Sequence, residues 1–464
     1  MPAVGCKRRE AFPVPLTGRS VSALLLTGIT FGAALTFAAF AWLQHSRGAV
    51  FNSGDPIGYY VYLRSLVHDG DLDFTNDYAF FQPSIEIPGM NMGRTDPVTG
   101  RPDNNYTIGL PLLIAPLYAA ATVLLAGHYP ARGVVTAFPL FLDELIFSYG
   151  GLVVAAAGIW LAFRFVSLYF PEPISLAATI VFWLCGPLLY YTAREPFQSH
   201  SASVFAVSSF LYVWKIPSLR VPVRWALMGM SGALVVMTRQ QDGVVLLIPV
   251  GAALMDGGWR SVQRRLPALP FAVIGFLALF VLQMGVWYLL RGSLLTYAYR
   301  GQEFTFLSRP RIADVLFSSN HGLISWHPII AVCLMGLMLL SVGQHATLGR
   351  LSLACFVTEL YVAASWWCWW MGNSFGQRGF LNLTPVFILG LAAVITRLTH
   401  RWQRRLFLAC AGGLFLWNVV LMFAYLAEMV PYQGEFSWVQ LITKLPELPS
   451  KVLGKAKVLS PPAS

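Results

Sequence analysis

Residues 267–290 read PALPFAVIGFLALFVLQMGVWYLL, a stretch of 24 residues without a single charged side chain. A helix needs about 20 predominantly apolar residues to cross a bilayer. Backbone groups inside lipid must be hydrogen-bonded within their own segment, so a stretch of this kind is expected to be helical. The sequence therefore predicts a transmembrane helix at this position.

Similar apolar stretches recur along the whole chain of 464 residues, which is 56% hydrophobic and only 11% charged. A soluble domain carries about 25% charged residues, roughly twice this fraction. We therefore expect an all-α, polytopic helical bundle with about 11 spans (roughly 10 to 13), formed as a single integral membrane domain over residues 1–464. The expected spans are residues 21–43, 145–164, 174–191, 200–214, 225–238, 243–256, 267–290, 326–342, 351–369, 380–396 and 405–427.

The basic residues between spans predict the orientation of this bundle. The net charge is +11, and the clusters lie in the connections 215–224, 260–265 and 397–405. Cytoplasmic loops are enriched in Lys and Arg, which explains these clusters better than nucleic-acid binding does. Four basic residues before residue 21 are typical of a retained signal anchor with a cytoplasmic N-terminus.

One apolar segment, residues 109–127, carries two prolines, and its path across the membrane is open. If it crossed alone, every later basic cluster would face outward, against the positive-inside rule. We therefore expect a juxtamembrane or re-entrant segment, or one arm of a hairpin with residues near 130–145. The outer segments are then the large first loop 45–144, which contains juxtamembrane helices, the loop 291–325 and the tail 428–464. The tail mixes Lys with apolar residues and is expected to lie on membrane lipids.

The first loop offers the clearest candidate for chemistry, Asp55, about a dozen residues beyond the first span. A carboxylate at the lipid–water boundary can accept the proton of a hydroxyl nucleophile while a lipid-borne substrate lies alongside. The following stretch 57–67, with Tyr59 and Tyr60, can form an amphipathic helix. Asp55 can equally cap that helix, and the residues alone leave both roles open.

The acids further along this loop permit a metal site or a turn. Asp71 and Asp73 could bind a divalent cation through oxygen ligands, as could Asp55. They could also form a solvated turn around Gly70, which we favour. The six cysteines are scattered and predict neither a disulfide framework nor a zinc site.

Four further polar segments fall on the predicted outer side. They are residues 194–200, 239–242, 319–327 and 366–378. Charged groups at membrane depth are costly and often functional, although simple snorkelling to the interface is the alternative. An Arg in a Gly/Ser-rich turn next to tryptophans suits a lipid phosphate. The candidate substrate-binding residues from these segments are Arg194, Glu195, His200, Arg239, His321, Trp369 and Arg378.

The order of these features resembles the GT-C superfamily of membrane glycosyltransferases, such as the dolichyl-phosphate-mannose protein mannosyltransferases and the aminoarabinose transferases. The residues that carry the resemblance are Gly54-Asp55 with Tyr59 and Tyr60, the run 68–74, the segment 109–116 and the turn 369–378. They run in order over most of the chain. Two departures from the family are Pro56, where many relatives have Glu, and Glu195, where relatives often have Asp.

The resemblance implies an inverting transfer from a polyprenyl-phosphate-linked sugar to a hydroxyl on a lipid, glycan or protein acceptor. Asp55 would be the general base, in a multi-pass protein of the bacterial cytoplasmic (inner) membrane with an outward-facing site. Some relatives use a divalent metal ion and others do not, so no cofactor is assigned. The alternatives are a membrane transporter, or a glycan ligase or polymerase that uses a pyrophosphate-linked lipid. The absence of a clean internal repeat argues against a transporter.

Overall fold

The computed structural model describes residues 25, 27–38, 50–51, 54–85, 93–129, 135 and 137–459. Within these residues the secondary structure is helical, apart from one isolated bridge between Thr95 and Pro102. The basic residues before position 21, most of the predicted first span 21–43 and the end of the tail lie outside the described residues. The expectation of an all-α protein is confirmed for the described part of the chain.

Seven described helical segments are long and apolar enough to cross a membrane, which is consistent with an integral membrane protein. They are Phe141–Val166, Val221–Thr238, Gln240–Gln263, Leu266–Arg291, Ala346–Ser365, Arg378–Thr396 and Arg401–Leu426. The helices of these segments are α5 (Ala137–Val166), most of which is included, α9 (Val221–Thr238), α10 (Ile248–Gln263), α11 (Leu269–Arg291), α15 (Ala346–Ser365), α16 (Thr384–Thr396) and α17 (Arg401–Leu426). Shorter apolar helices are Thr27–Ala38, α4 (Gly109–Leu124), α6 (Glu172–Cys185) and α14 (Ile329–Ser341).

Proline and glycine mark where several of these helices begin and end. Proline stands in the first turn of α6, α9, α10, α11 and α16. Its fixed φ suits this position, where the missing N–H costs no helical hydrogen bond. Helix α11 ends at Gly292, whose φ of 67° is left-handed and whose N–H donates to the Tyr288 carbonyl. Glycine adopts this conformation without steric cost.

The outward faces of α11 and α17 are apolar. Ile274 is 65% exposed on α11 and Leu408 is 64% exposed on α17, and each lies in a row of exposed aliphatic and aromatic side chains. By contrast, the central helices α8 (Ser199–Lys215) and α16 bury most of their side chains. Large exposed apolar surfaces of this kind are typical of contact with lipid or with a partner.

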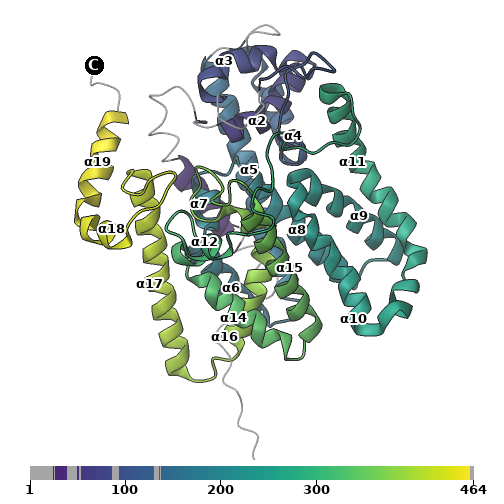
Figure 1. Cartoon of the computed structure of the whole chain (residues 1–464), viewed down its shortest axis with the longest axis vertical. Coiled ribbons are helices and arrows are strands. Elements are labelled where there is room, and N and C mark those ends of the chain that lie inside the picture. Colours follow the sequence, from purple (N-terminus) through teal and green to yellow (C-terminus); the bar gives the residue numbers. More distant parts are fainter. Residues whose placement is uncertain are drawn as a thin grey trace, which may run out of the picture.

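The connections between helices gather at two opposite ends of the bundle. At one end, a pocket is lined by Tyr169, Lys215, Asp256 and the turn 344–348, and Thr347 donates to Asp256 at 2.7 Å. At the other end lie α2 (Gly54–Arg64), α3 (Thr75–Ile85) and α4, at the top of Figure 1. The connections 215–224, 260–265 and 397–405 carry the basic clusters that are expected to share one side of the membrane. These connections lie away from the polar segments of the first loop.

Helix α2 differs from the amphipathic surface helix expected over residues 57–67. It runs from Gly54 to Arg64, continues as a π-helix over Ser65–Asp69, and buries nearly all of its side chains. The reason is that α4, α5 and the segment 93–108 cover it. The Tyr62 hydroxyl, for example, donates to the Tyr106 carbonyl at 2.8 Å.

Helix α4 settles part of the ambiguity at residues 109–127, because it lies antiparallel to the start of α5. Ile114 contacts Gly150 of α5, and one turn later Tyr118 adjoins His68 and the charge of Asp143. Residues that come later on α4 therefore lie beside residues that come earlier on α5. Residues 137–145 belong to α5 itself and do not form a separate arm before it.

The remaining described helices are short and connect or cover the bundle. They are α7 (Leu188–Ala193), α12 (Ile312–Phe317), α13 (Leu323–Trp326), α18 (Trp438–Lys444) and α19 (Leu448–Leu459). The last two lie beside α17 at one flank of the molecule (Figure 1). Exposed apolar residues on α18, such as Val439 at 71%, fit the expectation of a tail that lies on lipid.

Helices α14 and α16 approach each other so closely that only glycine fits between them. A Cβ added at Gly336 would overlap the carbonyl oxygen of Gly390, and one added at Gly390 would overlap the carbonyl oxygen of Cys333. Small residues at such crossings let backbones approach and pack within a membrane. The crossing fixes α16, and therefore also the residues immediately before it.

We expect Gly390→Ala to lower the free energy of unfolding by about 1–3 kcal/mol, because α14 and α16 must separate to admit the methyl group. Thermal unfolding of the detergent-solubilised protein measures this change. Gly413→Ala on α17 is the matched control, since nothing lies within 4 Å of its Cβ position. A loss of stability in the control as large as in Gly390→Ala would contradict the role of the crossing.

Candidate functional site

The candidate base Asp55 lies in the first turn of α2, where it meets residues from two distant segments. Its Oδ2 accepts from the Arg378 guanidinium at 2.9 Å, and its Oδ1 accepts from the Tyr106 hydroxyl at 2.5 Å. The side chains of Asp55 and Arg378 are 16% and 14% exposed, so the ion pair is largely buried but still reached by solvent. Both carboxylate oxygens are thus used by side chains, which goes beyond a helix-capping role.

Arg378 reaches Asp55 from a turn whose backbone is tightly fixed. The Phe375 N–H donates to the Tyr191 hydroxyl at 3.0 Å, and the Gln377 side chain donates to the Trp369 carbonyl at 2.9 Å. Gly376 has a φ of 63°, and a Cβ there would also overlap the His327 ring. The turn therefore requires glycine at this position, and it delivers Arg378 just before α16.

A second carboxyl group, Glu195, lies close to the same guanidinium. The Tyr190 hydroxyl donates to its Oε1 at 2.9 Å. Burial raises the pKa of the Glu195 carboxyl above its usual range, although the charges of Arg194 and Arg378 and the Tyr190 hydrogen bond oppose the shift. Two carboxyl groups thus share the surroundings of Arg378.

Arg239 and His200 form a further pair near Arg378. Arg239 donates to the His200 Nδ1 at 3.3 Å and to the Gly379 carbonyl at 3.2 Å. Because arginine can only donate, His200 accepts through Nδ1 and carries its proton on Nε2. The Gly379 contact joins the segment 239–242 to the residue that follows Arg378.

Tyr59 belongs to this site, whereas its neighbour Tyr60 lies outside it. The Tyr59 ring lies 4.5 Å from that of Tyr106, between centroids. The Tyr60 hydroxyl instead donates to Asp143 at 3.1 Å, in a separate cluster where His68 also contacts Asp143. Successive residues on a helix point in different directions, so only one of the two tyrosines faces Asp55.

His321 and Trp369 lie at the edge of the site, where they support its frame. His321 has a φ of 63°, and its Nε2 is 3.0 Å from the Tyr432 carbonyl, so it fixes the segment after α17. Burial lowers the pKa of His321 to about 4, and the imidazole is neutral at pH 7. Trp369 is 6% exposed and contributes its carbonyl to Gln377.

The acids Asp71 and Asp73 form a turn, as favoured, and do not join Asp55. Asp73 accepts from both the backbone and the hydroxyl of Thr75, at the start of α3, and Asp71 accepts from the Asp73 N–H. Both side chains are exposed. No group of three or more His, Cys, Asp or Glu side chains suited to a metal ion occurs among the described residues.

Three tyrosines at the site were not predicted from the sequence, namely Tyr106, Tyr191 and Tyr299. Tyr106 directly contacts Asp55, and the Tyr299 ring lies 6.4 Å from the Tyr106 ring. The run Asp103-Asn-Asn-Tyr106-Thr107 is polar and stands immediately before the apolar α4. That abrupt change in polarity was the signal that could have identified Tyr106.

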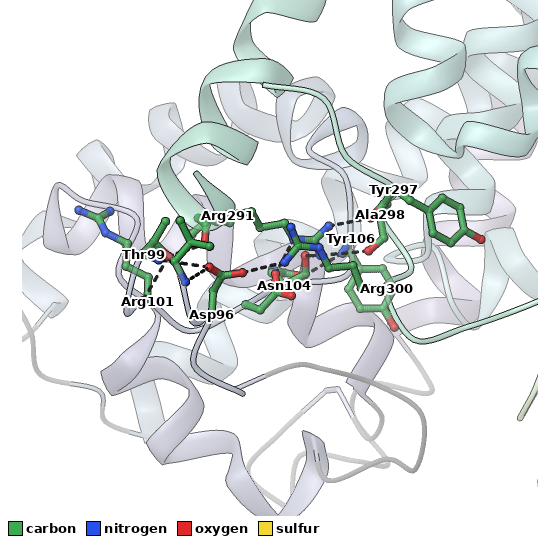
Figure 2. Close-up of polar contacts among 12 residues, drawn as sticks. Asp96, Thr99, Arg101, Asn104, Tyr106, Arg291, Tyr297, Ala298 and Arg300 are labelled. Carbon is green, nitrogen blue, oxygen red and sulfur yellow. Dashed lines mark hydrogen bonds and ion pairs between the residues drawn. The ribbon is translucent and has the colours of Figure 1, made fainter. Parts of the chain in front are cut away.

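The segment that carries Tyr106 is fixed to the end of α11 by two arginines (Figure 2). Arg291 donates to the Asp103 carboxylate at 2.6 Å, to the Asn104 carbonyl at 2.8 Å and to the Ala298 carbonyl at 3.0 Å. Arg300 donates to the Asp96 carboxylate at 2.7 Å. The first loop and the loop 291–325 therefore form one unit at the site.

No protein-family model matches the chain, and no curated protein matches it either.

We expect Arg300→Ala to increase hydrogen exchange in residues 93–106, because the buried Asp96 loses its cation while Arg291 still holds the far end of the segment. Breaking one partner of a buried pair leaves an uncompensated charge, whereas an exposed arginine contributes little. Exchange measured by mass spectrometry tests this. Arg309→Ala, an exposed arginine of the same outer loop, is the control. Equal exchange in both variants would show that the Asp96 pair does not order the segment.

Proposed function

We propose that this chain is a membrane glycosyltransferase of the GT-C type, which uses a polyprenyl-phosphate-linked sugar. The observation that carries the proposal is the pairing of Asp55 with Arg378 at a site where five polar segments meet. A carboxylate that can take a proton and a guanidinium that can bind a phosphate stand 2.9 Å apart. Transfer of a sugar from a lipid phosphate to a hydroxyl uses a base for the hydroxyl proton and positive charge for the departing phosphate.

The reaction would proceed in one inverting displacement. The acceptor hydroxyl gives its proton to the Asp55 carboxylate as its oxygen forms a bond to the anomeric carbon. The bond between that carbon and the phosphate oxygen breaks, and its electron pair leaves with the lipid phosphate. Arg378, with Arg239 and Arg194 nearby, offsets the negative charge that develops on the phosphate. No step requires a metal ion, although an added cation could share the phosphate charge.

We expect Asp55→Asn to lower sugar transfer by about 10²–10⁴-fold, because the acceptor proton loses its base. The donor is first identified by mass spectrometry of the lipid that co-purifies with the protein, and transfer is then measured with that lipid labelled in its sugar. Asp73→Asn is the matched control, since it removes an acid from the same loop but keeps a side chain that caps α3. Full activity in Asp55→Asn would refute the base assignment.

The proposal includes a bundle of about 11 spans with this site on the outer face of a bacterial cytoplasmic membrane. Supporting it, the basic connections 215–224, 260–265 and 397–405 avoid the end that carries Asp55. Lys215 lines the pocket at the opposite end, and Arg397 donates there to the Leu339 carbonyl at 3.2 Å. Positive charge on the cytoplasmic side agrees with this orientation.

A reporter fused after Arg405 is expected to read cytoplasmic, and one inserted after Gln302 is expected to read external. The positive-inside rule gives the first result, and the contacts of the loop 291–325 with the Asp55 site give the second. Paired phosphatase and fluorescent-protein fusions measure both. If the two positions read the same side, the proposed topology is wrong.

A transporter is the second candidate, favoured by one buried acid inside a helix. Glu359 lies within α15 and is 7% exposed, and Asn382 donates to its Oε1 at 2.7 Å. Ionisable groups at membrane depth often mark proton or ion pathways. Labelled sugar transfer in detergent, where no gradient exists, separates the two candidates because only the enzyme produces a new covalent product.

A further inference from the structure

The carboxylate of Asp55 has two partners that cannot both stay during the proposed reaction. Arg378 holds Oδ2 and Tyr106 holds Oδ1. The other titratable groups close enough to interact electrostatically with Asp55 are Tyr59, Tyr191, Glu195, Tyr299 and Cys368. None of these five groups is a cation, and Arg378 supplies the positive charge next to the carboxylate.

A phosphate that binds Arg378 must compete with Asp55 for the same guanidinium. Arginine binds phosphates and carboxylates through the same planar N–H donors. Once the phosphate takes these donors, Oδ2 of Asp55 loses its cation and becomes available to the acceptor hydroxyl. The same event would leave the carboxylate free to rotate, unless a second contact holds it.

Tyr106 is well placed to supply that second contact. Its N–H donates to the Asn104 side chain at 3.0 Å, and its carbonyl accepts from the Tyr62 hydroxyl at 2.8 Å. Arg291 in turn fixes Asn104 to the end of α11 (Figure 2). Burial, followed by the charge of Asp55, raises the pKa of the Tyr106 phenol, so it keeps its proton and acts as a donor.

We infer that Tyr106 is the positioning residue that keeps Asp55 in place after the donor phosphate has drawn Arg378 away from it. This inference rests on the proposed function. Donor binding then precedes activation of the base: Oδ1 stays on the Tyr106 hydroxyl, and Oδ2 receives the acceptor proton. If the acceptor hydroxyl arrives before the lipid-linked sugar, the Asp55 carboxylate is still paired with Arg378.

The test begins with binding, which needs no turnover. Farnesyl monophosphate, a soluble analogue of the lipid product, is titrated into the purified full chain from about pH 5 to about pH 8 at constant ionic strength. Dissociation constants are compared between the wild type and Asp55→Asn at each pH. Their ratio cancels the ionisation of the phosphate itself and of groups common to both proteins.

We expect Asp55→Asn to bind farnesyl monophosphate roughly three- to tenfold more tightly near pH 8, because Arg378 is then free of its competitor. Tyr106→Phe and Tyr297→Phe are titrated in the same way. Tyr297→Phe, a tyrosine of the same aromatic row that is 42% exposed, should match the wild type.

Kinetics supplies the second readout. Tyr106→Phe should lower kcat at least about tenfold with KM changed by less than about twofold. The reason is that the variant misplaces the base but removes no contact with the lipid-linked sugar. Equal phosphate binding in the wild type and Asp55→Asn at every pH would overturn the inference. So would identical behaviour of Tyr106→Phe and Tyr297→Phe.

Failure of the inference and failure of the proposed function give different results. If sugar transfer occurs but Tyr106→Phe matches the wild type in both readouts, the positioning role alone is wrong. If no lipid-linked sugar is transferred while the binding ratios behave as expected, the contacts of Asp55 stand and the glycosyltransferase proposal falls.

Discussion

The ion pair between Asp55 and Arg378 is the interaction on which the arrangement of the candidate site depends. It joins the start of α2 to the residue that opens the α16 segment, more than 300 positions along the chain. Exposed ion pairs contribute about 0–1 kcal/mol, and burial adds a desolvation cost that only further hydrogen bonds offset. A largely buried pair with one supporting tyrosine therefore contributes little to the stability of the fold. A role in binding or catalysis better explains why the pair lies where separate segments converge.

The surroundings of this pair are rigid for reasons that can be traced residue by residue. On one side, the close crossing of Gly336 with Gly390 fixes α16, which Arg378 precedes. On the other side, the Arg291 guanidinium donates hydrogen bonds to three backbone carbonyls and to the Asp103 carboxylate. A fully buried guanidinium is stable only when its donors are satisfied in this way. Arg378 and the segment that carries Tyr106 are therefore held by contacts on different helices, and each can be altered separately.

Much of the fold could be predicted from hydropathy, because apolar stretches of sufficient length leave the backbone one option in lipid. The helix over 267–290 follows from that constraint, and α11 (Leu269–Arg291) confirms it. The candidate pair Asp55 and Arg378 was also identified, since both stand in polar turns next to apolar helices. What the sequence could not supply was the partner of each side chain. Tyr59 and Tyr60 look equivalent in sequence, yet helical geometry sends one to Tyr106 and the other to Asp143. Tyr106 was missed because its role depends on tertiary contacts with α11.

Two carboxyl groups lie near Arg378, and their contacts differ. Glu195 accepts from the Tyr190 hydroxyl, and burial raises the pKa of its carboxyl. Asp55 accepts from the Arg378 guanidinium and from the Tyr106 phenol, and its side chain is 16% exposed. Under the proposed function, a phosphate that withdrew Arg378 would leave one oxygen of Asp55 available to the acceptor hydroxyl, while the Tyr190 contact of Glu195 stayed in place. The proposal of Asp55 as the base therefore rests on its contacts as well as on its place after the first predicted span.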